Sequence, residues 1–278
     1  MRFYKINGAG NDFIVINNIE ENIPSEKFPI LAKTLCTRRM SIGADGLMVV
    51  EKSDVADFRM DFYNCDGSIG EMCGNGARCI CRYAFAVGLS GEKQTVETCS
   101  GIIHGDRLTE QLYRIEMTKP THINVLCEIN SLGKRIQCSY IELGNPPLPH
   151  AVVYMPNVNS VSDGELFDLG RAIRENKAFP NGANVNFYDI TGEDEVYIRT
   201  FERGVEDFTY ACGSGTCSTA LALYLKGELK SGRLIADMRG GRLEAEVLQT
   251  GDEYSLYLTG PTNIVARGEV LDEELINN

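Results

Sequence analysis

Alternating apolar and polar residues predict β-strands along much of this chain. Alternation with period two marks the segments Phe58–Asn64, Gln94–Thr98, Tyr113–Met117, Val196–Glu202, Arg233–Asp237 and Ser255–Thr259. Apolar residues at helical spacing follow Ser25 and Asp163, and two nearly continuous apolar runs cover Ala77–Val87 and Thr216–Leu225. Because apolar residues cover most faces of these two runs, they predict helices that are buried on most sides. We therefore expect an α+β fold.

The same order of elements occurs twice at a nearly constant spacing. Phe58–Asn64 precedes Val196–Glu202 by almost half of the chain, and Gly101 precedes Gly241 by nearly the same interval. The repeat predicts two pseudo-symmetric lobes, each a mostly antiparallel sheet wrapped around a central helix. We expect the N-terminal lobe at 1–120, the C-terminal lobe at 121–261, and a last segment, 262–278, that joins the N-terminal lobe as a further strand.

A short glycine-cysteine signature precedes each of the two buried helices. The signatures are Met72-Cys73-Gly74-Asn75-Gly76 and Ala211-Cys212-Gly213-Ser214-Gly215, and half of the chain separates their cysteines. The first turn of a helix presents unpaired N–H groups and a partial positive charge, so it stabilises a thiolate and can bind a carboxylate. Two such thiols can act as base and acid on opposite faces of one carbon. This pattern predicts a two-thiol active site in the cleft between the lobes, suited to inverting the α-carbon of an amino acid.

Other kinds of site explain the signatures less well. A glycine-rich turn beside a buried cysteine is common, so one copy alone would be weak evidence, whereas two copies in matching places are stronger. Neither loop has the GxxxxGKS or GxxxxGKT pattern of a phosphate-binding loop. The ten cysteines include no CxxC pair and the three histidines are scattered, so we expect no metal site.

Composition limits the kinds of partner that the protein could bind and the compartments in which it could function. The net charge is −12 and no block of Lys or Arg occurs, which argues against nucleic acid as a partner. No apolar stretch is long enough to cross a bilayer, and the first residues lead into a strand pattern without the apolar core of a signal peptide. We expect a cytoplasmic protein with no membrane partner, whose cysteines are thiols. The oligomeric state stays open, and a homodimer is one option.

Several motifs give the chain a resemblance to a known family. They are Gly10-Asn11-Asp12-Phe13, Ile42-Gly43-Ala44-Asp45-Gly46, Tyr63-Asn64-Cys65-Asp66-Gly67-Ser68, Asn184-Val185-Asn186-Phe187, Glu202-Arg203-Gly204 and the two cysteine signatures. In these residues the chain resembles the diaminopimelate epimerases, within the wider family of cofactor-independent amino-acid racemases. The resemblance implies an isomerase that interconverts LL- and meso-2,6-diaminopimelate in lysine and peptidoglycan precursor biosynthesis. It also implies catalysis without pyridoxal phosphate, metal or any other cofactor.

The resemblance implies a role for individual residues as well. Cys73 and Cys212 would be the catalytic acid/base pair. The reacting carboxylate and amine would lie among Gly74, Asn75, Gly213 and Ser214 with Asn11 nearby, and the unreactive end of a small-molecule diamino diacid would be held by Asn64, Asn184, Glu202 and Arg203. Asn145 belongs to a turn that is longer than usual in the family, so its contact with the substrate stays open.

Alternative functions remain. The longer turn at Asn145 leaves room for a related substrate such as lanthionine, and histidine racemases of the family are a further alternative, although histidine has no second amino-acid end for Glu202 and Arg203 to bind. Isomerisation of a substrate that is not an amino acid is less favoured, because that branch of the fold lacks the paired cysteines. A protein of another class, a thiol-redox or non-catalytic amino-acid-binding protein, could also use Cys73 and Cys212.

Overall fold

The chain divides into two compact units. The structure, a computed structural model, describes residues 1–70 and 73–271. Unit 1 comprises Met1–Ile115 together with the chain from Gly260, and unit 2 comprises Glu116–Thr259. The boundaries expected from the sequence fell after residues 120 and 261. Met72 of the first signature and residues 272–278 of the expected last segment lie outside the described residues.

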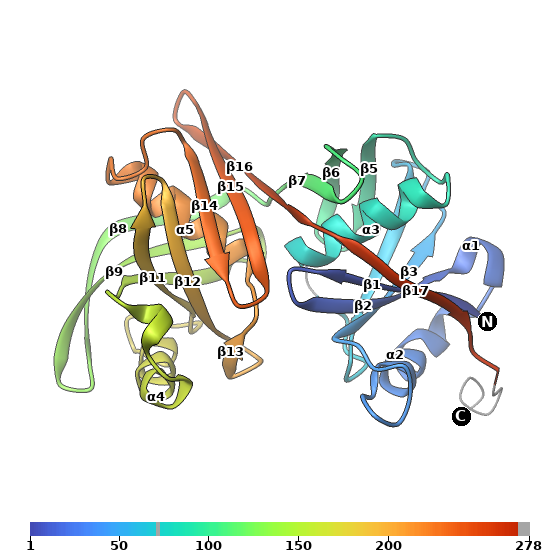
Figure 1. Ribbon diagram of the computed structural model, residues 1–278, viewed down its shortest axis with the longest axis horizontal. Coiled ribbons are helices and arrows are strands. Elements are labelled where there is room, and N and C mark those ends of the chain that lie inside the picture. The colour runs from blue at the N-terminus through green and yellow to red at the C-terminus, as the bar shows by residue number, and fades with distance from the viewer. Residues whose placement is uncertain (71–72, 272–278) are drawn as a thin grey trace. The chain divides into compact units, whose positions relative to one another are not determined.

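Unit 1 is built on one curved sheet. Its strands are β1 (Arg2–Gly8), β2 (Asn11–Asn17), β3 (Gly46–Glu51), β4 (Phe58–Asn64), β5 (Lys93–Thr98), β6 (Gly101–Arg107), β7 (Leu112–Glu116) and β17 (Asn263–Glu269). They pair in the order β17-β1-β2-β3-β4-β5-β6-β7, and all pairs are antiparallel except β2/β3 and β4/β5. The expected strand after Pro261 is therefore confirmed as β17, which runs beside β1 (Figure 1).

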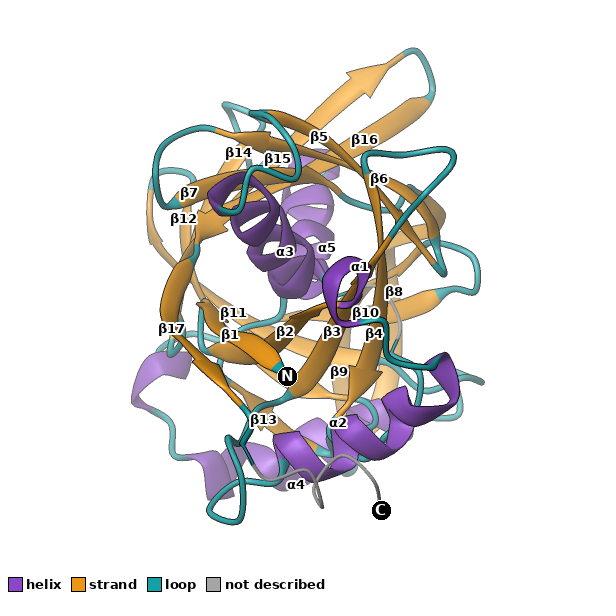
Figure 2. Cartoon of the chain, turned by 90° about the vertical axis from the view of Figure 1, so that its right-hand side faces the viewer, coloured by secondary structure: helices purple, strands orange, loops and turns teal. Residues whose placement is uncertain are grey.

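Two sets of helices cover the two faces of this sheet. Helix α3 (Gly74–Ala86) contacts β1, β2, β6 and β17 and lies within the curve of the strands (Figure 2). Helix α2 (Phe28–Cys36) packs on the other face against β3 and β4, with the short helix α1 (Asn18–Glu21) and the 3-10 turn Ser25–Lys27 before it. The α2 face is an apolar core, in which Phe28, Leu31 and Leu35 contact strand residues such as Ile14 and Val49. Both faces of the central strands are thus buried, which explains their continuous apolar runs.

Unit 2 repeats this plan. Its strands are β8 (Pro120–Ser131), β9 (Lys134–Leu143), β10 (Leu148–Tyr154), β11 (Asn184–Gly192), β12 (Glu195–Glu202), β13 (Asp207–Thr209), β14 (Arg233–Met238), β15 (Gly241–Thr250) and β16 (Glu253–Pro261). The order is β8-β9-β10-β11-β12-β14-β15-β16, with β13 also on β12. The longer strands β8 and β9 are in the places of β17 and β1. Helix α5 (Gly213–Leu225) packs against β9, β10, β11, β14 and β15. Helix α4 (Asp163–Arg174), after the 3-10 turn η2 (Val158–Ser160), packs against β11 and β12.

The internal duplication and the fold class are confirmed. In unit 2 the parallel pairs are β10/β11 and β12/β14, at the places that β2/β3 and β4/β5 occupy in unit 1. The glycines that open β6 and β15, Gly101 and Gly241, both have positive φ angles, 109° and 128°, a backbone region that favours glycine. Each unit is an α+β arrangement with one buried helix against a mostly antiparallel sheet. None of the helices in the described part of the chain is long and apolar enough to span a membrane.

Candidate active site

Cys73 is the residue that caps the N-terminus of α3. Its backbone is extended, with φ −109° and ψ 115°, and the helix begins at the next residue, Gly74. The Sγ atom accepts a hydrogen bond from the backbone N–H of Gly76 at 3.5 Å. The side chain therefore satisfies one of the free N–H groups at the helix start and lies in the positive end of the helix dipole.

Cys212 occupies the same position on α5. Its φ and ψ are −124° and 110°, and its Sγ accepts a hydrogen bond from Gly215 N at 3.4 Å. The hydroxyl of Ser214 also lies 3.4 Å from this sulfur. The residue is 6 % exposed, whereas Cys73 is half-buried. The expected placement of both cysteines at helix starts is confirmed, and the two N-termini repeat one local geometry.

Glycine at the third position after each cysteine is a steric requirement. A Cβ on Gly215 would lie 2.1 Å from the side-chain oxygen of Asn186, and one on Gly76 would lie 2.5 Å from the terminal carbon of Met48. Such contacts are far shorter than atoms tolerate, so a Cβ at either glycine would force its neighbour to move. The Asn186 side chain is held by buried hydrogen bonds, whereas the end of the flexible Met48 side chain can shift, so the requirement is stricter at Gly215 than at Gly76. The thiol and its N–H donor are held in place by this close packing.

Three of the expected substrate-contacting residues of unit 1 lie together at the start of α3. Asn75 is 1 % exposed and donates to the side-chain oxygen of Asn11 at 2.6 Å. Arg78, which is fully buried, donates to the side-chain oxygen of Asn75 at 2.8 Å and to the carbonyl of Gly74 at 3.2 Å. Arg78 was not among the residues expected at the site. The sequence signal for it is a charged side chain inside an otherwise apolar helix, one turn after Gly74.

Asn64 lies at the same end of the unit 1 strands as Asn11. It is level with Gly46 across β3/β4, and Gly46 is level with Phe13, two residues after Asn11 on β2. Its side chain donates to the hydroxyl of Ser68 at 3.0 Å. The register therefore brings Asn64 and Asn11 to one end of the sheet, although their strands are not adjacent.

Unit 2 brings Asn184 and Arg203 into direct contact. The side-chain oxygen of Asn184, a residue that is 2 % exposed, accepts a hydrogen bond from Arg203 N at 2.7 Å. The guanidinium of Arg203 donates to the carbonyl of Asn181 at 2.9 Å. Glu202, the last residue of β12, is half-buried beside them. Asn145, in contrast, is exposed in the turn between β9 and β10, and its role stays a prediction.

A buried polar cluster below the start of α5 was not anticipated. The side chain of Asn186 contacts Nδ1 of His150 at 3.3 Å and accepts from the hydroxyl of Thr200 at 2.9 Å. His150 is fully buried, and burial, followed by the positive charge of Arg203, lowers its pKa from 6.5 to about 3. Because the imidazole is neutral in the folded protein, it adds no charge beside Arg203. The sequence signal that could have indicated this cluster is a polar residue, Asn186, at an inward position of the buried strand β11.

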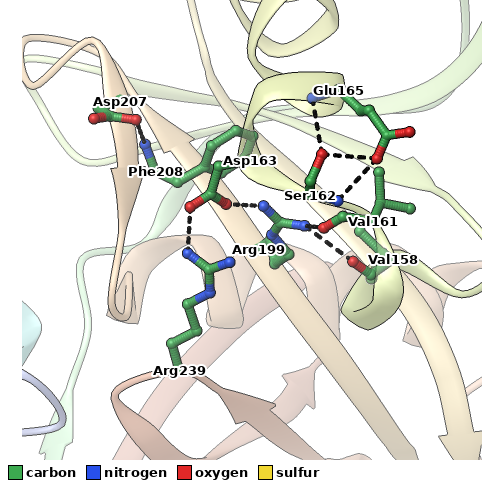
Figure 3. Close-up of polar contacts among 9 residues, drawn as sticks. All are labelled: Val158, Val161, Ser162, Asp163, Glu165, Arg199, Asp207, Phe208 and Arg239. Atoms are coloured by element: carbon green, nitrogen blue, oxygen red, sulfur yellow. Dashed lines mark hydrogen bonds and ion pairs between the residues drawn. The ribbon is translucent and has the colours of Figure 1, made fainter.

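A second unanticipated cluster joins β12 to the start of α4. Figure 3 shows the guanidinium of Arg199, 3 % exposed, among the carbonyls of Val158 and Val161 and the carboxylate of Asp163, which also binds Arg239. The Arg199 guanidinium also lies 4.8 Å from the centre of the Phe208 ring on β13. β12 ends at Glu202, and β13 is followed by Cys212. The cluster therefore connects the strand that carries Glu202 to the strand that precedes Cys212.

Metal ligation has no support in the described residues. No three or more of their His, Cys, Asp and Glu side chains come together in a group that could hold a metal ion. The site residues described above instead supply a thiol, backbone N–H groups, amides and a guanidinium in each unit, and unit 2 adds the carboxylate of Glu202.

Known proteins match this chain over nearly its whole length. The family model described as diaminopimelate epimerase matches residues 3–123 and 140–265. A protein of Chlorobaculum tepidum named diaminopimelate epimerase is 38 % identical over 275 residues, which is 95 % of this chain and 99 % of that protein. One of Aquifex aeolicus with the same name is 35 % identical over 99 % of both chains.

Solved structures show the same fold at low sequence identity. A phenazine biosynthesis protein of the PhzF family from Bacillus anthracis superposes with a TM-score of 0.76 over 98 % of this chain and 99 % of its own, at 16 % identity. A hydroxyproline epimerase from Agrobacterium vitis gives a TM-score of 0.71 over 96 % and 91 %, at 13 % identity. The fold is thus shared with proteins of different activities. The full-length match to the family model and to its named members shows that this chain belongs to the diaminopimelate epimerase family.

Proposed function

We propose that this protein is an isomerase that interconverts LL- and meso-2,6-diaminopimelate by proton transfer at the α-carbon, in lysine and peptidoglycan precursor biosynthesis. The observation that supports it best is the pair of N-capping cysteines, whose sulfurs lie 3.5 Å and 3.4 Å from the N–H nitrogen of the third residue of each helix start. The proposal requires Cys73 and Cys212 to act on opposite faces of one substrate carbon.

The proton balance of the reaction follows from two thiols. One sulfur, as thiolate, removes the α-proton, and the opposite thiol gives its proton to the other face of the carbon. The configuration inverts, and the two cysteines exchange their protonation states. No electron leaves the substrate, so the reaction needs no oxidant.

Stabilising the carbanion is the harder part of this chemistry. A helix dipole contributes only about 0.3–2 kcal/mol to an adjacent negative charge. Fixed hydrogen-bond donors in a water-excluded site contribute roughly 3–4 kcal/mol each. We infer that the N–H groups at Gly74, Asn75, Gly213 and Ser214 bind the carboxylate into which the carbanion charge spreads, with Asn11 holding Asn75 in place.

The polar groups at the end of β12 are suited to bind the distal amino-acid group of the substrate, the one that does not react. Arg203 would bind the distal carboxylate bidentately and Glu202 the distal ammonium, with Asn64 and Asn184 as neutral partners. The bond from Arg203 N to Asn184 supports this grouping within unit 2. We propose the cytoplasm as the compartment, because this chemistry needs reduced sulfurs.

Solvent-hydrogen exchange tests the proposal directly. In D₂O, LL-diaminopimelate incubated with the protein should gain deuterium at the α-carbon as the meso isomer forms. Cys73→Ser and Cys212→Ser should each slow this at least ~10²-fold, and Cys99→Ser, at an exposed cysteine, should not. Full activity in both active-site variants would refute the mechanism. Faster exchange with lanthionine or histidine would reassign the substrate, and no exchange with any amino acid would favour a redox or binding role.

A further inference from the structure

Two cysteines outside the proposed active site face each other across the first hairpin of unit 2. Cys127 on β8 is level with Cys138 on β9, in an antiparallel register. Residues level with each other on antiparallel strands point their side chains to the same face, with Cα atoms about 4.5–5.5 Å apart. That spacing lies within the roughly 4.4–6.8 Å over which disulfides form.

Both cysteine side chains lie on the face of the hairpin that packs into the core of unit 2. Cys138 is 4 % exposed at the bottom of the hairpin core, and Cys127 is half-buried. A reagent that approaches from solvent therefore meets Cys127 first.

The environment of the pair sets the order of reaction. Burial, and then the neighbouring Cys127 thiol, raise the pKa of Cys138, while the ammonium of Lys226 opposes that rise. Cys138 is thus the poorer first nucleophile, because the thiolate is the reactive form. It is well placed to react second, because the sulfur of Cys127, which it would attack once a reagent has modified Cys127, lies directly across the hairpin.

We propose that Cys127 and Cys138 form a dithiol modification site, which a small-molecule disulfide oxidises to a cross-strand disulfide. The Cys127 thiolate attacks one sulfur of the reagent, whose S–S bond breaks and releases one thiol. Cys138 then loses its proton and attacks Cys127 Sγ, releasing the second thiol. The protein loses two hydrogens and two electrons, and the reagent gains them as two thiols.

Oxidised glutathione tests this on the full chain. The Cys73→Ser/Cys212→Ser variant removes the proposed active-site thiols from the reaction. Trypsin cuts after Lys134 and Arg135, between the two cysteines, so a disulfide links two separate peptides under non-reducing conditions. We expect this linked pair to form and to vanish on reduction. In a further Cys138→Ser variant, a glutathione adduct should accumulate on Cys127.

Exposed cysteines supply the internal control. Cys65 and Cys99 are exposed and should take up glutathione under the same conditions. If they are modified while the linked peptides are absent, the proposal is wrong. It is equally wrong if Cys127 or Cys138 links to another cysteine, or if Cys127 retains glutathione while Cys138 is present.

Discussion

A cysteine at a helix N-cap performs two roles that can be separated at the level of one residue. The sulfur accepts a hydrogen bond from the third helical N–H, as the side chains of Ser, Thr and Asp commonly do at helix starts, and it also carries the titratable proton. A serine oxygen in its place keeps the first role. It loses the second, because a hydroxyl is far less acidic than a thiol.

The two roles predict opposite outcomes for stability and activity. Cys73→Ser and Cys212→Ser should each unfold within about 1 kcal/mol of the unchanged protein, because serine is a favoured N-cap. Urea titration measures this alongside the exchange assay. Cys73→Ala, which lacks the acceptor, should lose about 1 kcal/mol more than Cys73→Ser. If both variants are equally destabilised, the sulfur is not acting as a cap.

His150 predicts how stability depends on pH. Its pKa falls from 6.5 to about 3 on folding, so the folded state favours the neutral ring. This contribution is complete above pH 6.5 and is lost as the pH falls towards 3. Linkage gives a loss of up to about 2 kcal/mol in unfolding free energy between pH 7.5 and pH 5.

A pair of histidine variants isolates that contribution. Denaturant unfolding at the two pH values should show a smaller loss in His150→Gln than in the unchanged protein. His104 is exposed, so His104→Gln should lose as much as the unchanged protein. Equal pH dependence in all three proteins would show that His150 is not the group responsible.

At the scale of elements, the buried Arg199 joins pieces of chain that the sequence separates. It connects β12 to η2, to the first residue of α4 and to the Phe208 ring on β13 (Figure 3). A guanidinium can serve all of these partners at once because its donors lie in a fixed plane and its face can stack on a ring.

Removing this guanidinium should destabilise the protein strongly. Arg199→Met leaves the Val158 and Val161 carbonyls without their donor, at an expected cost of about 2–4 kcal/mol. Arg242→Met breaks an ion pair with Asp237 in which Arg242 is 59 % exposed, so it should cost less than about 1 kcal/mol. Urea midpoints measure both. Equal losses would contradict a special role for Arg199.

At the scale of the whole molecule, the last described strand belongs to the first unit. β17 pairs with β1 from Arg2/Glu269 to Asn7/Asn263, while most of its side chains are exposed. It is therefore held mainly by ladder hydrogen bonds. Those bonds also cover the edge of β1, which would otherwise present unpaired backbone groups.

Truncation after Thr262 should affect one unit selectively. Loss of β17 should increase hydrogen exchange of β1 amides by at least ~10-fold, since each lost hydrogen bond contributes about 1 kcal/mol. Exchange in β11 and β12, within unit 2, should stay as it was. Mass-spectrometric exchange by peptide measures both, and unchanged exchange in β1 would contradict the assignment.

Short-range patterns determined much of this protein. Period-two alternation located β4, β5, β7, β12, β14 and β16 to within two residues, and the two signatures located the starts of α3 and α5. Those features arise from neighbours in sequence: a strand alternates because its two faces differ, and a helix start needs a cap. The repeat at half of the chain length then indicated the duplicated plan, because two segments with the same order of strands and helices are expected to adopt the same topology.

Contacts between residues distant in sequence were decided by the tertiary structure alone. The β8/β9 hairpin was missed, although inward and outward residues alternate along β8 from Ile123 to Ser131. The register shifts near His122 and Cys127 belong to the pairing with β9, which alternation within one strand does not determine. The burial of three polar side chains was also missed, those of Arg78, Arg199 and His150. A charged or polar residue is expected to be exposed unless its hydrogen-bond partners are known. Burial of such a group is favourable only when distant chain segments supply its hydrogen bonds, and the sequence order does not say which segments those are.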